Sequence, residues 1–180
     1  MLISGLADRG YAVRGFDLRP GPTTSDMVVG DCDPAAMRER GIRRVYASSH
    51  HAVGWHARAE MLGVDARPRP DTFSGVGKVA AKALVSLYVD RYGLSAACLR
   101  IGSFLERPTS RRHLATWLSY GDAVRLVDAC LTAPDLGYRV VYGTSGNTRV
   151  WWDLAPDGLR VGGDFAGAAY GRPGFAEGSA

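Results

Sequence analysis

The sequence KVAAKALVSLYVDRYGLSAACLRI, residues 78–101, joins an amphipathic helix to a short strand. Apolar side chains recur at spacings of three and four over residues 78–92, which is the period of a helix with one face on a core. Gly93 ends this predicted helix, and the apolar run 95–101 has the length of a strand. A helix feeding a strand in this way is typical of a parallel sheet with helices packed against it.

The same alternation continues on both sides of this unit. It predicts a Rossmann-like α/β domain over residues 1–161, with helices on both faces of a parallel sheet. A tail rich in glycine and alanine follows over residues 162–180. The other predicted strands are 12–16, 26–29, 43–48 and 139–142, and the other predicted helices are 6–10, 34–40 and 122–132.

The composition excludes several classes of protein. With 180 residues, 46% hydrophobic and 22% charged, the chain has the profile of one globular domain. No apolar run approaches the roughly 18 residues of a membrane span, and the first residues lack a signal-peptide pattern. The three cysteines are widely separated, which predicts reduced thiols and a cytoplasmic location. They are Cys32, Cys98 and Cys130.

Neither a metal nor a nucleic acid is the predicted partner. His50 and His51 are adjacent, so on an extended segment their rings point to opposite sides and chelate poorly together. The arginines are interrupted by acidic and apolar residues, and the net charge of +4 is a weak hint of an anionic small ligand.

Three features fit an enzyme that uses a dinucleotide, two at strand ends and one at the start of the predicted helix 78–92. Asp17 ends a strand, where an acid binds ribose hydroxyls in dinucleotide folds, although an aspartate is also common in turns. Residues 48–51, SSHH, follow the strand 43–48, and ligands of open parallel sheets bind beyond such ends. These side chains could equally cap their own backbone. Lys78 could bind ribose hydroxyls or be a solvated charge.

Five segments together resemble the uronate dehydrogenases. These are NAD-dependent enzymes of the extended short-chain dehydrogenase/reductases, within the NAD-dependent epimerase/dehydratase superfamily. The segments are RRVYASSHHAVG (43–54), RPDTFSGVGKVAAKALVSLYVDRYG (69–93), CLRIGSF (98–104), RRHLATWLSYGDAVRLVDACLTAP (111–134) and VVYGTSGNTRVWWD (140–153). The resemblance implies oxidation of a hexuronic acid at its anomeric carbon, with NAD as cofactor and an aldarolactone as product.

The resemblance also assigns roles by position. Ser49 matches the catalytic serine, and Lys78 matches the lysine of the YxxxK motif. Arg112 matches a residue that holds the sugar acid, which suits a guanidinium because it pairs with a carboxylate through two hydrogen bonds. The substrate contacts are His50 (where the family usually has Asn), His51, Ser103 and Arg112; the cofactor contacts are Asp17, Asp31, Lys78 and Ile101. The helix 78–92 is of the type that forms homodimers in this superfamily.

The tyrosine of the YxxxK motif is replaced by Ser74, four positions before Lys78. A tyrosine phenol has a pKa of about 10, and a neighbouring ammonium lowers it so that a phenolate can accept the substrate proton. A serine hydroxyl is a much weaker acid on a shorter side chain. We therefore expect a severe loss of oxidation activity.

Two parts of the family's sheet have no counterpart in this sequence. The first strand and its glycine-rich phosphate turn are missing, with only Gly5 near their place. Residues 34–44 are too few for the helix, central strand and second helix expected there. The sheet is therefore predicted to be incomplete, with the strands 12–16 and 26–29 in one fragment, unless strand 12–16 closes up beside strand 43–48.

Three functions follow from these patterns. The first is an NAD-dependent dehydrogenase of the uronate type. The second is an inactive remnant of such an enzyme. The third is a non-catalytic protein that keeps the sugar-acid pocket around Ser49, His51, Ser103 and Arg112.

Overall fold

The computed structural model describes residues 2–12, 15–17, 27–29, 34–39, 41–58 and 61–154. The predicted boundary at residue 161 and the tail 162–180 lie outside the described residues. The helices are α1 (Leu2–Ala7), α2 (Pro34–Glu39), the 3-10 helix η1 (His50–Val53), α3 (Phe73–Tyr92), α4 (His113–Thr116) and α5 (Tyr120–Thr132). The strands are β1 (Gly15–Asp17), β2 (Met27–Val29), β3 (Arg43–Ser49), β4 (Ser95–Ile101), β5 (Ser103–Phe104), β6 (Trp117–Leu118) and β7 (Tyr138–Gly143).

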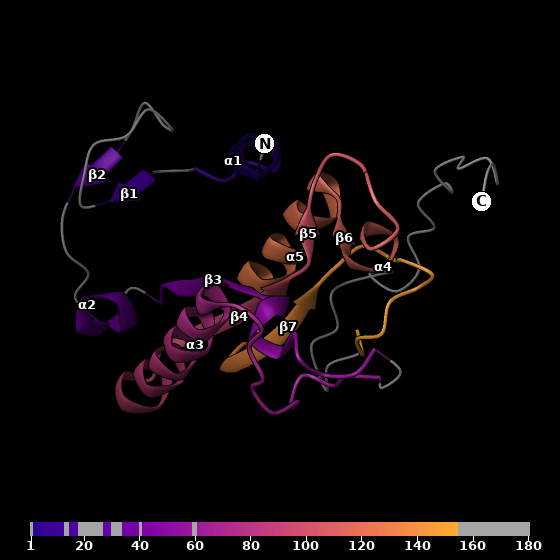
Figure 1. Ribbon diagram of the computed structural model, residues 1–180. Coiled ribbons are helices and arrows are strands. Elements are labelled where there is room, and N and C mark those ends of the chain that lie inside the picture. Colours follow the sequence, from indigo (N-terminus) through magenta and orange to yellow (C-terminus); the bar gives the residue numbers. More distant parts are fainter. Residues whose placement is uncertain are drawn as a thin grey trace, which may run out of the picture.

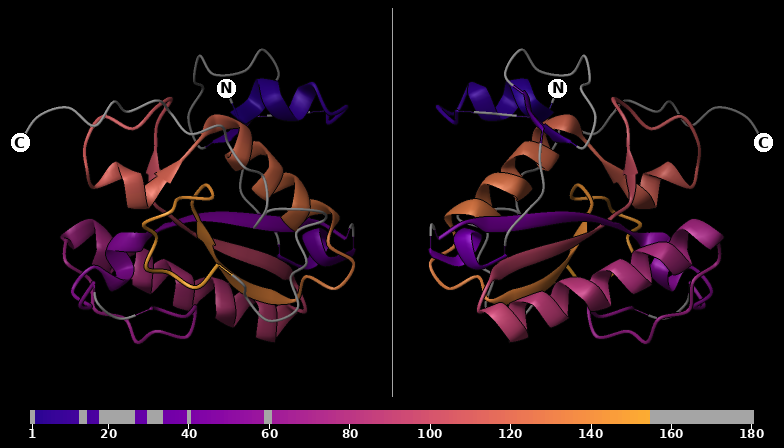
Figure 2. Two further views of the ribbon diagram at one scale, coloured as in Figure 1. Left: turned by 90° about the vertical axis from the view of Figure 1, so that its right-hand side faces the viewer. Right: turned by 90° about the vertical axis from the view of Figure 1, so that its left-hand side faces the viewer.

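The centre of the fold is a three-stranded parallel sheet in the order β3-β4-β7. Figure 2 shows α5 on one face of this sheet and α3 on the other. The Rossmann-like arrangement predicted from the alternation of strands and helices is therefore confirmed. Because all three strands are parallel, their carboxyl ends gather at one edge of the sheet, where β3 and β4 end opposite each other at Ser49 and Ile101.

The strands β1 and β2 form a separate parallel pair, apart from the central sheet (Figure 1). The hypothesis that strand 12–16 closes up beside strand 43–48 is therefore wrong, because β1 pairs with β2. Within the described part of residues 34–44 the chain forms α2 and then enters β3, with no strand between them. The prediction of an incomplete sheet with its strands in two fragments is thus confirmed.

The two helices that cover the sheet are packed very differently. Five residues of α5 are buried, and Leu126 and Cys130 join Leu99 and Val141 in the main core. In α3 only Gly75 is buried, and Leu84 and Leu87 are each about half exposed at 53% and 52%. The helix itself was predicted correctly, but the prediction of its buried face was wrong. Leu84, Leu87 and Tyr88 of the predicted core face are exposed, because no described element covers them. Lys82 and Ser86, which were expected on the solvent side, are partly buried.

Local signals explain where α3 begins and ends. The Oγ1 atom of Thr72 accepts a hydrogen bond from the Gly75 amide at 2.9 Å, so the helix begins at Phe73, five residues before the predicted start. Gly93 ends it as predicted, in the left-handed conformation with φ of 62° that glycine adopts without strain. Ser74 therefore lies inside the first turn of α3.

The short elements β5, α4 and β6 were not predicted, because two-residue strands and a one-turn helix leave no periodic signal. They are held against the sheet by close backbone contact. A Cβ atom at Gly102 would lie 2.0 Å from the Thr116 carbonyl oxygen, so only glycine fits between β4 and α4. None of the helices in the described ranges is long and apolar enough to cross a membrane.

Candidate sugar-acid site

The candidate site lies where β3 and β4 end. Ser49 is the last residue of β3, and its Oγ atom accepts the amide hydrogen of His51 at 3.2 Å. This bond caps η1 and turns His50 and His51 across the end of the sheet. The interpretation of residues 48–51 as a backbone cap is therefore correct. The cap also places both imidazoles at the edge of the sheet where the carboxyl ends of the strands lie.

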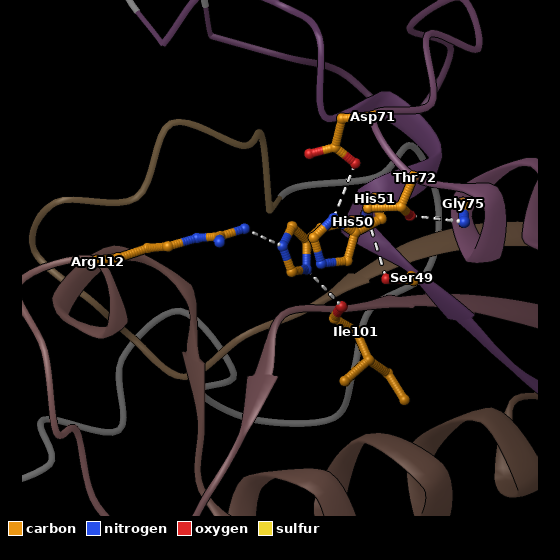
Figure 3. Close-up of polar contacts among 8 residues, drawn as sticks. All are labelled: Ser49, His50, His51, Asp71, Thr72, Gly75, Ile101 and Arg112. Atoms are coloured by element: carbon orange, nitrogen blue, oxygen red, sulfur yellow. Dashed lines mark hydrogen bonds and ion pairs between the residues drawn. The ribbon is translucent and has the colours of Figure 1, made fainter.

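His50 links β4 to Arg112 at the start of α4 (Figure 3). Its Nδ1 atom lies 3.0 Å from the carbonyl oxygen of Ile101, and its Nε2 atom lies 2.8 Å from Nη2 of Arg112. A carbonyl only accepts and a guanidinium only donates, so Nδ1 carries the proton and Nε2 accepts. His50 therefore stands as a neutral imidazole that positions the Arg112 guanidinium.

Burial lowers the pKa of His50 from its ordinary value to about 4. The positive charge of Arg112 also lowers this pKa, while the hydrogen bond to Ile101 and the negative charge of Asp71 act in the opposite direction. His50 is only 8% exposed, so a proton added to it would have no water to solvate it. The neutral form required by the hydrogen bonds is also the form that burial favours.

We expect His50 to make the folded state less stable as the pH falls from about 6.5 to about 4. In this window the unfolded chain protonates the residue and the folded chain does not, so the free energy of unfolding falls by up to about 1.4 kcal/mol per pH unit. Urea unfolding at several pH values will show this slope for the unmodified chain. The His50→Asn variant will give a flatter curve, and parallel curves would contradict a buried neutral His50.

His51 is held by Asp71, a residue that the sequence analysis did not single out. The Nδ1 atom of His51 lies 2.8 Å from Oδ1 of Asp71, and the Asp71 amide donates to the His51 carbonyl oxygen at 3.2 Å. The carboxylate only accepts, so Nδ1 donates to it, and Nε2 is the ring nitrogen that Asp71 does not bind. The only sequence signal was the position of Asp71 directly before the Thr72 cap.

Two glycines permit this close arrangement. A Cβ atom at Gly54 would lie 2.1 Å from Cγ of Asp71, and one at Gly75 would lie 2.4 Å from the carbonyl oxygen of His51. Both distances are shorter than a Cβ atom tolerates. Asp71, just before α3, and the first turn of α3 therefore lie directly against η1 and the residue that follows it. The His51–Asp71 pair therefore depends on glycine at both positions.

Beside these groups lies a small polar hollow of about 120 Å³, open to solvent. Trp152 on its wall is buried and stacks on Tyr142, with the ring centroids 5.2 Å apart. The hollow thus has one aromatic wall and polar groups from several segments. Its lining residues are His50, Val53, Gly54, His56, Arg58, Asp71, Arg112, Trp151 and Trp152.

Other predicted site residues lie away from this hollow or are bonded within the chain. Ser74 is exposed on the first turn of α3. The hydroxyl of Ser103 pairs with Oγ1 of Thr116, the last residue of α4, at 2.8 Å. In the described ranges no group of three His, Cys, Asp or Glu residues is placed to hold a metal ion.

Two of the residues predicted to contact NAD are bonded within the chain. Nζ of Lys78 donates to the Ala47 carbonyl oxygen at 2.6 Å, and the Ile101 carbonyl oxygen is taken by His50. Asp17 ends β1, outside the central sheet, and its side chain is not described; Asp31 lies outside the described residues. The contact of these four residues with the cofactor therefore stays a prediction.

No protein-family model matches the chain. Curated relatives do match. The uronate dehydrogenase of Pseudomonas syringae is 42% identical over 119 residues, covering 66% of this chain and 43% of the relative. The uronate dehydrogenase of Agrobacterium fabrum is 43% identical over 111 residues, covering 62% of this chain and 42% of the relative. The matched region thus spans less than half the length of these relatives.

Solved structures agree with the sequence matches. A variant of the Agrobacterium tumefaciens uronate dehydrogenase complexed with NAD is 31% identical, with a TM-score of 0.71, and the match covers 83% of this chain and 74% of that one. A glucuronic acid dehydrogenase from Chromohalobacter salexigens is 28% identical, also with a TM-score of 0.71, covering 87% of this chain and 76% of that one.

Proposed function

The chain belongs to the uronate dehydrogenase family, a family of NAD-dependent sugar dehydrogenases, and we propose that it binds a hexuronate at the hollow beside β3 and β4 without oxidising it. The observation that carries this proposal is the chain of hydrogen bonds from Ile101 through His50 to Arg112. It holds a guanidinium beside the carboxyl ends of β3 and β4, where the carboxylate of a sugar acid would be recognised.

Each group of the site has a binding role. Arg112 uses one of the five donors of its guanidinium on His50, which leaves a pair of parallel donors for a carboxylate. Nε2 of His51 hydrogen-bonds a sugar hydroxyl, because Asp71 binds Nδ1 and leaves Nε2 for the ligand. Ser49 accepts the His51 amide and keeps its own hydroxyl hydrogen to donate. Ser103 remains a predicted further contact.

The absence of oxidation rests on Ser74. The family reaction needs a group that removes the proton from the anomeric hydroxyl, and a tyrosine phenolate is suited to this by its pKa. Ser74 has an aliphatic hydroxyl, and it is exposed on α3. Since Lys78 donates to Ala47, its ammonium is also committed to the backbone of β3.

We expect the Ser74→Tyr variant to remain inactive, because it supplies the phenol but not the cofactor crevice. Absorbance at 340 nm will stay flat for this variant, and for the unmodified chain, with galacturonate or glucuronate and NAD. A functional uronate dehydrogenase serves as the positive control. Steady NADH production by the purified variant would contradict the loss of the NAD site.

Two further expectations are part of this proposal. A homodimer through α3 is supported by the exposed apolar side chains Val76, Leu84 and Leu87. A cytoplasmic location is supported by the free thiols of Cys98 and Cys130. Sedimentation that gives a monomer at all concentrations would contradict the dimer.

A further inference from the structure

The hollow is lined by two arginines that come from distant parts of the chain. Arg112 precedes α4, whereas Arg58 belongs to the loop that follows η1. Both side chains are largely exposed, and each is placed by an uncharged partner. Arg112 donates to the neutral His50, and the guanidinium carbon of Arg58 lies 5.5 Å from the ring centroid of Trp151.

Neither arginine forms an ion pair with a carboxylate in the described part of the chain. Asp71 is the one carboxylate that lines the hollow, and its Oδ1 atom is bonded to His51 at 2.8 Å. Two guanidiniums that face one small space repel each other unless an anion lies between them. The hollow is therefore an electropositive site with donors for more than one anionic group.

We infer that this hollow is specific for a sugar diacid, with one carboxylate on Arg112 and the other on Arg58. The inference rests on the proposed function, because it adds a second carboxylate contact to the same sugar-acid site. Trp151 and Trp152 line the same hollow as the two arginines, and Trp151 holds the Arg58 guanidinium beside it. A ligand with a single carboxylate leaves one guanidinium without an anion.

The test compares galactarate, which has two carboxylates, with galacturonate, which has one. In calorimetry at pH 7.5 and fixed ionic strength, the unmodified chain will bind galactarate at least about tenfold more tightly than galacturonate. In the Arg58→Met variant this preference will be lost, chiefly because galactarate binding weakens. The Arg91→Met variant is the matched control, since Arg91 also lies over an aromatic ring, 5.7 Å from the Tyr92 centroid, but outside the hollow.

The outcomes separate this inference from the proposed function. Equal affinities for the two ligands would overturn the diacid inference and leave hexuronate binding in place. A preference for galactarate that survives Arg58→Met would overturn the role of Arg58. Binding of galactarate without any binding of galacturonate would support the diacid and contradict the proposed function. Binding of neither ligand would contradict both.

Discussion

An Arg112→Met variant will bind galacturonate about 10- to 100-fold more weakly than the unmodified chain. Methionine retains most of the side-chain length but provides no donor for a carboxylate. The guanidinium is held in place by His50, so its loss removes a contact that is already oriented before the ligand arrives. Fluorescence reports this binding directly, because the indoles of Trp151 and Trp152 line the hollow.

Arg111→Met is the matched control for this experiment. Arg111 is adjacent in sequence, carries the same charge and is exposed, but it does not line the hollow. Its replacement will leave the fluorescence titration nearly unchanged, which separates a specific carboxylate contact from the general positive field. Equal effects of the two substitutions would show that Arg112 does not hold the carboxylate. Circular dichroism and the melting temperature will show that both variants fold.

The second large effect is a loss of stability on replacing Gly75, which lies directly against η1. A Cβ atom there would lie 2.4 Å from the His51 carbonyl oxygen and 3.1 Å from Oγ1 of Thr72. In Gly75→Ala the start of α3 must move away from η1, and we expect a loss of about 1–3 kcal/mol in the free energy of unfolding. Hexuronate binding will weaken as well, because the His51–Asp71 pair shifts with η1.

Gly77→Ala provides the internal comparison on the same helix. A Cβ atom at Gly77 meets nothing within 4 Å, so alanine there gains helix propensity without a clash. We expect this variant to be more stable than the unmodified chain by about 0.5–1 kcal/mol. Urea unfolding measures both variants. If Gly75→Ala is stabilised as much as Gly77→Ala, the close contact between α3 and η1 does not exist.

The elements with strong periodicity could be predicted from the sequence. Strand 95–101 has the predicted bounds, and Gly93 ends α3 as expected, because apolar spacing and a left-handed glycine are local signals. Periodicity does not show whether another element packs on an apolar face. Leu84 and Leu87 have the spacing of a buried face, yet they are about half exposed, since burial depends on neighbours that sequence spacing cannot specify.

The roles of the site residues stay a prediction, but their positions can be compared with the sequence. The resemblance pointed to His51 and Arg112; His51 directly follows the end of β3 at Ser49 and His50, and Arg112 reaches the same place through its hydrogen bond to His50. Asp71 was missed because its contact with His51 spans 20 positions and arises from the turn into α3. The bond from Lys78 to Ala47 was also unpredicted, because it depends on how α3 lies over the strand β3.

Calorimetric titration of galacturonate into the full chain, in the absence of NAD, measures directly whether the chain binds a hexuronate by itself. We expect saturable heat with a stoichiometry of one ligand per chain, because Arg112, His50 and His51 are positioned without a cofactor. The absence of heat at millimolar galacturonate would contradict this expectation, since it would mean that this arrangement of side chains does not bind the sugar acid.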